Sequence, residues 1–206
     1  MFSDRKDAAQ QLALALARYK DQHAVVLGIP RGGAETGYYV AKGLHAEFSL
    51  LIARKLGHPT NPEYAIGAIA EDGSRYLNPR VTPPVEEAMI DKIVAEQQGE
   101  IARRIQALRK GAPMPQLKDR IVIIVDDGIA TGSTLFASIA LCKKQKPSRL
   151  VVAAPISSID MRDHLKQIVD DVVILETPED YYAVSQGYAS FPQLSDEEAR
   201  EFFERK

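Results

Sequence analysis

The sequence predicts an α/β domain with an open, mainly parallel twisted sheet flanked by helices. Residues 24–29, 121–126 and 149–155 are almost wholly apolar and rich in β-branched side chains, as strands buried on both faces are. Amphipathic helical patterns separate these runs, and such alternation is typical of a parallel sheet. The length of 206 residues suits one domain, so we expect residues 1–206 to fold as a single unit.

Local patterns place the elements in order. A first helix is expected over residues 4–19, because apolar residues recur at helical spacing after Ser3, a suitable N-cap. An apolar run and residues 75–78 flank an Asp-Gly turn signal, which predicts a hairpin. The strands are expected at 24–29, 47–53, 64–70, 121–126, 149–155 and 172–175, and the other helices at 33–44, 84–110, 132–144 and 158–168.

Composition excludes several classes of protein. A net charge of −2 gives no electrostatic reason to expect binding to nucleic acid or to a membrane. No apolar run approaches the roughly 20 residues that a membrane span needs, and the first residues lack signal-peptide character. Cys142 is the only cysteine, which excludes an intrachain disulfide and predicts a buried structural thiol. We therefore expect a cytoplasmic protein.

Two adjacent acids follow the most apolar strand. Asp126 and Asp127 stand at the carboxyl end of strand 121–126, the edge where open α/β sheets bind ligands. The next turn, residues 128–134, offers glycines, free backbone N–H groups and three hydroxyl side chains, and a helix is expected to start near its end. Such a turn suits a phosphate monoester, whereas the acids suit a sugar diol. Together they describe a site for a ribose 5-phosphate.

The segment from Val122 to Thr134 resembles the signature of the type I phosphoribosyltransferases, which bind phosphoribosyl pyrophosphate (PRPP). The resemblance implies that Asp126 and Asp127 are the catalytic residues and hold the ribose hydroxyls, directly or through magnesium. It also implies that the 5′-phosphate is wrapped by Ala130, Thr131, Gly132, Ser133 and Thr134. The alternative is a strand–turn–helix corner that uses Asp-Asp-Gly only as turn chemistry.

A second glycine-rich loop follows strand 24–29. Its residues are Pro30, Arg31, Gly32 and Gly33, in which the glycines permit close approach to an anion and Arg31 supplies a charge. The loop resembles the family element that grips pyrophosphate, often through a non-proline cis peptide. The alternative is an ordinary strand-to-helix turn with an exposed arginine.

An insertion of about residues 54–110 interrupts the alternation. Arg54 and Lys55 are candidates for pyrophosphate contacts, with a solvated strand end as the alternative. In the family a segment near residues 54–82 closes over PRPP. The helix at 84–110 is expected to pack on the sheet or on a partner subunit. Basic residues near its C-terminal end favour the helix dipole; they include Arg103, Arg104 and Arg109. The alternative is that Arg103 or Arg104 takes part in binding an anionic substrate.

The other addition is a C-terminal hood of about residues 176–206. Purine phosphoribosyltransferases often stack the base on an aromatic ring after the last core strand. The resemblance therefore makes Tyr181 and Tyr182, with Val184 beside them, candidates for acceptor binding, since a flat ring suits a heterocycle. Tyrosines that only cap the core are the alternative.

These resemblances imply a magnesium-dependent enzyme that moves 5-phosphoribosyl from PRPP to a nitrogenous, nucleobase-like acceptor and releases pyrophosphate. They also imply small-molecule substrates and a homodimer. Two positions depart from well-characterised members: Gly128 replaces a branched residue, and Ala130 replaces the aspartate of hypoxanthine-guanine enzymes. The best match is a bacterial group whose acceptor is undefined. A non-catalytic regulator that binds PRPP or a nucleotide is the main alternative, and a phosphoribosyl-handling hydrolase or phosphorolytic enzyme is a third.

Overall fold

A five-stranded parallel sheet forms the centre of the computed structural model, which describes residues 1–81 and 84–205. Two ends of expected segments lie outside the described residues. They are residue 82, where the segment expected to close over the site ends, and residue 206, where the expected domain and hood end. The strand order is β2-β1-β6-β7-β8, with every pair parallel, as the sequence predicts. The strands are β1 (Val25–Gly28), β2 (Glu47–Leu50), β6 (Ile121–Val125), β7 (Arg149–Ile156) and β8 (Asp171–Glu176).

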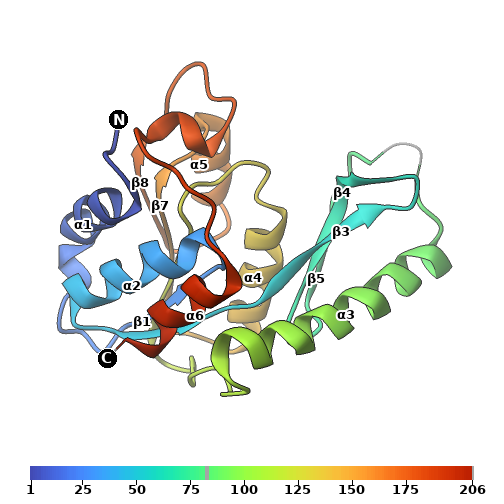
Figure 1. Ribbon diagram of the computed structural model, residues 1–206, viewed down its shortest axis with the longest axis horizontal. Coiled ribbons are helices and arrows are strands. Elements are labelled where there is room, and N and C mark those ends of the chain that lie inside the picture. Colours follow the sequence, from blue (N-terminus) through green and yellow to red (C-terminus); the bar gives the residue numbers. More distant parts are fainter. Residues whose placement is uncertain (82–83, 206) are drawn as a thin grey trace.

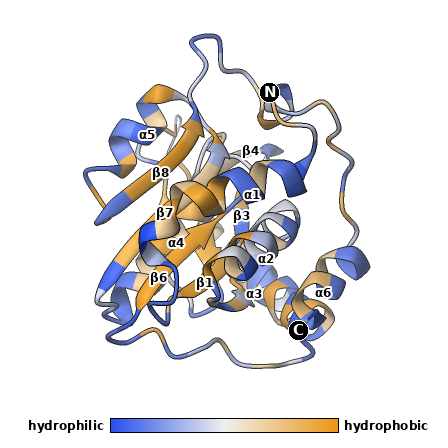
Figure 2. Ribbon diagram, turned by 90° about the vertical axis from the view of Figure 1, so that its left-hand side faces the viewer, coloured by the Kyte–Doolittle hydropathy of each residue, from blue (hydrophilic) through white to orange (hydrophobic). Residues whose placement is uncertain are grey.

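Helices cover both faces of this sheet (Figure 1). Side chains alternate along β6, so Ile123 and Val125 pack under α1 and α2, whereas Val122 and Ile124 pack under α4. Figure 2 shows β1, β6 and β7 as mainly apolar strands in the interior. The helices are α1 (Arg5–Ala15), extended by a 3-10 turn (Ala17–Tyr19), α2 (Gly32–Leu44), α4 (Ser133–Lys144) and α5 (Ile159–Leu165).

The strand expected at 47–53 is confirmed only over 47–50, because the chain then leaves the central sheet and joins another. Leu51 donates its backbone N–H to Gly28 O and still belongs beside the central sheet. The N–H of Ile52 instead bonds the Glu71 side chain, and from Ala53 the chain pairs with a strand that follows later. Since residues 50–53 are all buried and apolar, periodicity gave no sign of this change of partner.

A second, antiparallel sheet and a long helix project to one side of the core (Figure 1). The strand order of this sheet is β3-β4-β5. Strands β4 and β5 form the hairpin that the sequence predicts. Strand β3, which was not predicted, pairs with the other side of β4. Helix α3 packs on one face of this sheet and α4 on the other. The bounds are β3 (Ala53–His58), β4 (Asn61–Ala70), β5 (Arg75–Leu77) and α3 (Glu87–Arg109).

The chain after β8 returns across the core and pairs with the N-terminal residues. Phe2 donates its N–H to Gly187 O and accepts from Ala189 N–H, so the two segments lie side by side. A short 3-10 turn (Val184–Gly187) precedes a last helix, α6 (Asp196–Glu204), whose capping box joins Ser195 and Glu198.

Within residues 1–81 and 84–205, none of the helices is both long and apolar enough to cross a membrane. Cys142 is buried inside α4, where burial raises the pKa of its thiol, as expected of a structural cysteine.

Candidate active site

The two acids lie directly after β6, at the carboxyl edge of the central sheet, but their side chains face different ways. Asp126 is half-buried and lines two adjoining cavities. Burial, followed by the neighbouring Asp127 carboxylate, raises the pKa of Asp126 well above its usual range. The Asp127 carboxylate instead accepts from Arg5 Nε at 2.8 Å. Only one of the two acids therefore faces the cavities.

The predicted phosphate turn bounds the smaller cavity, of about 190 Å³. Gly132 adopts a left-handed conformation, with φ of 72°, and α4 starts at the next residue. The first N–H groups of a helix have no partner within it, so those of α4 are directed toward the turn. All five residues predicted to hold the phosphate line this cavity: Ala130, Thr131, Gly132, Ser133 and Thr134.

The Pro30–Gly33 loop lies against the backs of the acids. The peptide bond between Pro30 and Arg31 is cis, the geometry that the resemblance implies. A Cβ at Gly33 would meet the carbonyl oxygen of Val125 at 2.8 Å, and one at Gly32 would overlap the Asp127 carboxylate. Both glycines are thus required by close packing. The Arg31 side chain is exposed and stands outside both cavities, although Pro30 lines the larger one.

The larger cavity, of about 630 Å³, runs along the free edge of β3 toward α3. Alternate residues of a strand point to opposite faces, and here Lys55 lies on the α4 side, where it also lines the phosphate hollow. Arg54 lies on the α3 side, where its Nε donates to Gln97 Oε1 at 3.1 Å. Burial, followed by repulsion from Arg104, lowers the pKa of Arg54. Arg54 and Lys55, which the sequence predicts as neighbouring pyrophosphate contacts, therefore lie on opposite walls of the same cavity.

Helix α3 contributes residues to this cavity that the sequence singled out only in part. Arg104 lines it, as does Gln97, whereas Arg103 turns outward to pair with Glu100 and Asp196. His58, the last residue of β3, also lines the cavity, and its Nδ1 lies 3.0 Å from Thr60 Oγ1. Because α3 and β3 are far apart in sequence, only the fold could identify this shared wall.

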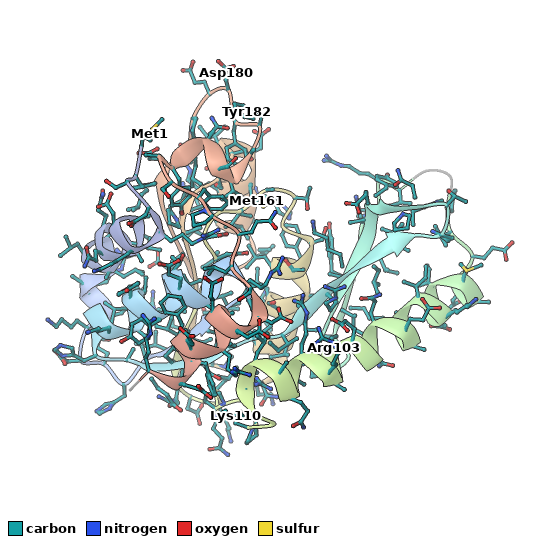
Figure 3. All side chains as sticks on the ribbon, in the orientation of Figure 1. Met1, Arg103, Lys110, Met161, Asp180 and Tyr182 are labelled. Atoms are coloured by element: carbon teal, nitrogen blue, oxygen red, sulfur yellow. The ribbon has the colours of Figure 1, made fainter. Side chains whose placement is uncertain are left out.

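The three candidates for acceptor binding are not gathered in the cavities. Tyr181 donates its hydroxyl to Ile129 O at 3.0 Å, and burial raises its pKa to about 12. Val184 packs over Gly128, behind the phosphate turn. Tyr182 is 81% exposed and projects near the tip of the loop after β8, on the far side from Arg103 (Figure 3). In this arrangement Tyr181 and Val184 support the turn, and Tyr182 faces solvent.

The packing of Val184 also explains why residue 128 is glycine. A Cβ at Gly128 would overlap Cγ1 of Val184 and stand 3.0 Å from Ile156 Cγ2. We predict that Gly128→Ala lowers the free energy of unfolding by about 1–3 kcal/mol, the usual cost of overpacking. Urea denaturation measures this loss. Adding Val184→Ala should return most of it, and an equal loss with and without Val184→Ala would contradict the explanation.

Arg5 is the residue near the acids that sequence reasoning missed. Its side chain is 5% exposed, and its Nη1 donates to Pro192 O at 2.6 Å. Its position in the sequence could have indicated burial, because it lies three residues before Ala8 and therefore on the apolar face of the first helix. A charged residue on such a face is rarely buried without a partner.

A magnesium ion, if bound, would depend on few protein ligands. In the parts of the chain that the structure describes, no group of three or more His, Cys, Asp or Glu side chains is placed to hold a metal. Magnesium is often held by only one or two carboxylates together with water and substrate phosphates. The Asp126 carboxylate, open to both cavities, fits that donor set, whereas Asp127 is already paired with Arg5.

Comparison with known proteins gives the family context. A model of the phosphoribosyl transferase domain matches residues 2–189. A Mycobacterium tuberculosis protein with the provisional name phosphoribosyl transferase is 42% identical over the whole chain. This chain spans 47% of that relative's length, about half. A uracil phosphoribosyltransferase from Metallosphaera sedula is 25% identical, over 88% of this chain and 89% of its own.

Solved structures agree on the architecture. The protein TT1426 from Thermus thermophilus is 35% identical and superposes with a TM-score of 0.83, covering 98% of this chain and 96% of its own. A hypoxanthine phosphoribosyltransferase from Staphylococcus aureus has a TM-score of 0.50 at 14% identity, over 86% of this chain and 76% of its own. The second likeness concerns the fold alone.

Proposed function

Because the chain belongs to the phosphoribosyl transferase family, we propose that it transfers 5-phosphoribosyl from PRPP to a nitrogenous, nucleobase-like acceptor and releases pyrophosphate. One observation carries the proposal: Asp126, Lys55 and Thr134 line both of the adjoining cavities. A carboxylate for the ribose, a cation and a phosphate turn therefore converge where the two cavities meet. That convergence suits a ligand with a sugar between two phosphate groups.

The phosphate turn and Asp126 would orient the sugar. Residues 130–134 hold the 5′-phosphate through helix N–H groups and hydroxyls, and Asp126 accepts hydrogen bonds from the ribose hydroxyls. Transfer breaks the bond between C1 and the pyrophosphate oxygen, and the electron pair leaves with pyrophosphate. Positive charge then develops on the ribose, as in glycoside cleavage. The acceptor nitrogen bonds to C1 with its lone pair, and its proton passes to water or to the departing pyrophosphate. The protein need not supply a nucleophile.

Positive charge at the leaving group is the other requirement. The proposal assigns pyrophosphate to the larger cavity, beside Lys55, Arg54 and the Pro30–Gly33 loop. Cations fixed in place stabilise charge that develops in the transition state. Magnesium, when bound through Asp126, would add neutralising charge at the pyrophosphate oxygens. Arg31, exposed in this conformation, would reach pyrophosphate only after the loop or its side chain moves.

We also propose that residues 1–206 form one domain. In this domain, residues 54–110 are an insertion that bounds the pyrophosphate end of the site, and residues 176–206 are the hood. Acceptor contacts by Tyr181, Tyr182 or Val184 would require the hood to rearrange, because two of these side chains support the turn and one faces solvent. A homodimer and a cytoplasmic location, both expected from the sequence, belong to the same proposal; sedimentation and cell fractionation test them.

Calorimetric titration with PRPP, with and without magnesium, tests the function. We expect magnesium-dependent micromolar binding, after which a panel of nucleobases is scored by pyrophosphate release. Absence of binding in both conditions would overturn the proposal. Binding with no turnover for any acceptor would instead favour the regulator that senses PRPP or a nucleotide.

A further inference from the structure

Arg5 joins the acid pair to the C-terminal segment through one buried guanidinium. Its Nε lies 2.8 Å from Asp127 Oδ2, in an ion pair whose side chains are 5% and 14% exposed. Its Nη1 bonds Pro192 O, and its guanidinium carbon stands 3.9 Å from the centroid of the Phe191 ring. A guanidinium can donate along its edge and stack on its face at once, which lysine cannot do.

The same ion pair fixes Asp127 against the glycine loop. The Asp127 carboxylate occupies the space that a side chain on Gly32 would need, so it packs directly on that loop. Tyr188, beside Phe191, donates its hydroxyl to the backbone carbonyl of Asp127 at 2.5 Å. Arg5 and the C-terminal aromatic residues therefore hold Asp127 from behind, while Asp126 stays open to the cavities.

We propose that Arg5 is a positioning residue for the PRPP site and acts through Asp127. By holding Asp127 against Gly32, it sets the spacing between the ribose end of the site, at Asp126, and the pyrophosphate end, at residues 30–33. The proposal rests on the proposed function. Its physical basis is that a misplacement of about 1 Å far from the reacting atoms can reduce the rate by about 100-fold. Affinity depends on the same spacing, because one PRPP molecule must reach both ends of the site.

A double-mutant cycle on Arg5→Gln and Asp127→Asn tests the coupling. Binding of PRPP with magnesium is measured by calorimetry, and KM and kcat by pyrophosphate release. We expect Arg5→Gln to raise the Kd and the KM for PRPP by about 10- to 100-fold and to change kcat less. In the Asp127→Asn background the same substitution should add less than about threefold, because the two side chains act as one unit. Arg5→Lys should recover part of the affinity, since it keeps the charge but loses the stacked fork.

Controls separate this role from general stability. Arg18→Gln removes a mostly exposed arginine that pairs with Asp171, and it should leave PRPP binding unchanged. Phe191→Leu removes the ring over Arg5 without touching the cavities, and it should raise the Kd for PRPP. This variant decides the question if Arg5→Gln fails to fold.

The outcomes distinguish the inference from the function on which it rests. Wild-type protein that does not bind PRPP overturns the proposed function itself. Wild-type binding with an unchanged Kd in folded Arg5→Gln, or in Phe191→Leu, overturns the role of Arg5 alone. Additive effects of Arg5→Gln and Asp127→Asn in the cycle would likewise reject the coupling, because independent sites contribute independently.

Discussion

Replacing Asp126 and Asp127 together with asparagine is expected to reduce pyrophosphate release from PRPP by about 10³-fold or more, the scale of lost preorganised electrostatic contacts. Asparagine keeps the shape of each side chain but removes the charge that would hold the ribose and magnesium. The effect should come mainly from Asp126, which faces both cavities, because Asp127 is paired with Arg5. Steady-state assays of the double and single variants measure it.

The Asp126 substitution should not destabilise the domain. Its carboxyl group is half-buried beside a second carboxylate, so the charged form is unfavourable in the free protein. Asparagine removes that repulsion, and we expect the Tm of Asp126→Asn to equal or exceed that of the wild type, as is common where function strains a site. Asp163→Asn, at a 53% exposed position on α5, is the matched control for activity. Full activity in the double variant would refute the roles proposed for the acids.

The sequence contains enough information to predict the central sheet and the ends of its strands. Residues 121–125 are uniformly apolar, so they require burial on both faces, and a parallel sheet provides it. Asp126 and the turn at 130–134 are close in sequence, hence their proximity in space follows from local geometry. The Pro30–Gly33 loop reaches them because β1 and β6 are neighbours in the sheet. Those parts of the candidate site were predictable because they depend only on residues close in sequence and on the pairing of β1 with β6.

Contacts between distant segments were not predictable. The Arg5–Asp127 pair joins residues 122 positions apart, and Val184 covers Gly128 from the other end of the chain. The end of the strand expected at 47–53 was misplaced for the same reason: the hydrogen-bond partners change from β1 to β4 while residues 50–53 stay apolar. Periodicity reports which residues are buried, but it cannot report what buries them.

Arg109 gives the largest expected effect on stability. The sequence suggests a basic residue that suits the end of a helix, yet its side chain is 2% exposed and forms an ion pair with Glu71. Its Nη1 also donates to the carbonyl of Leu50 at 2.9 Å, at the point where the chain leaves the central sheet. We predict that Arg109→Met lowers the free energy of unfolding by about 3–5 kcal/mol, because it leaves the Glu71 carboxylate buried without a cation and, among the described residues, with only the Ile52 N–H as hydrogen-bond donor. Urea denaturation measures this change.

A surface pair on the same helix provides the control. Arg103 pairs with Glu100 at a 55% exposed position, so Arg103→Met should cost no more than about 1 kcal/mol. An equally small loss for Arg109→Met would mean that water reaches Glu71. Adding Glu71→Met to Arg109→Met should recover part of the stability, since replacing both partners of a buried pair is often neutral. The recovery is incomplete because the N–H of Ile52 loses its acceptor. The pair also joins α3 to the ends of β4 and β2, close to β3, the strand that carries Lys55. If stability returns in the double variant but PRPP affinity does not, the ion pair orients the wall of the cavity rather than stabilising the fold.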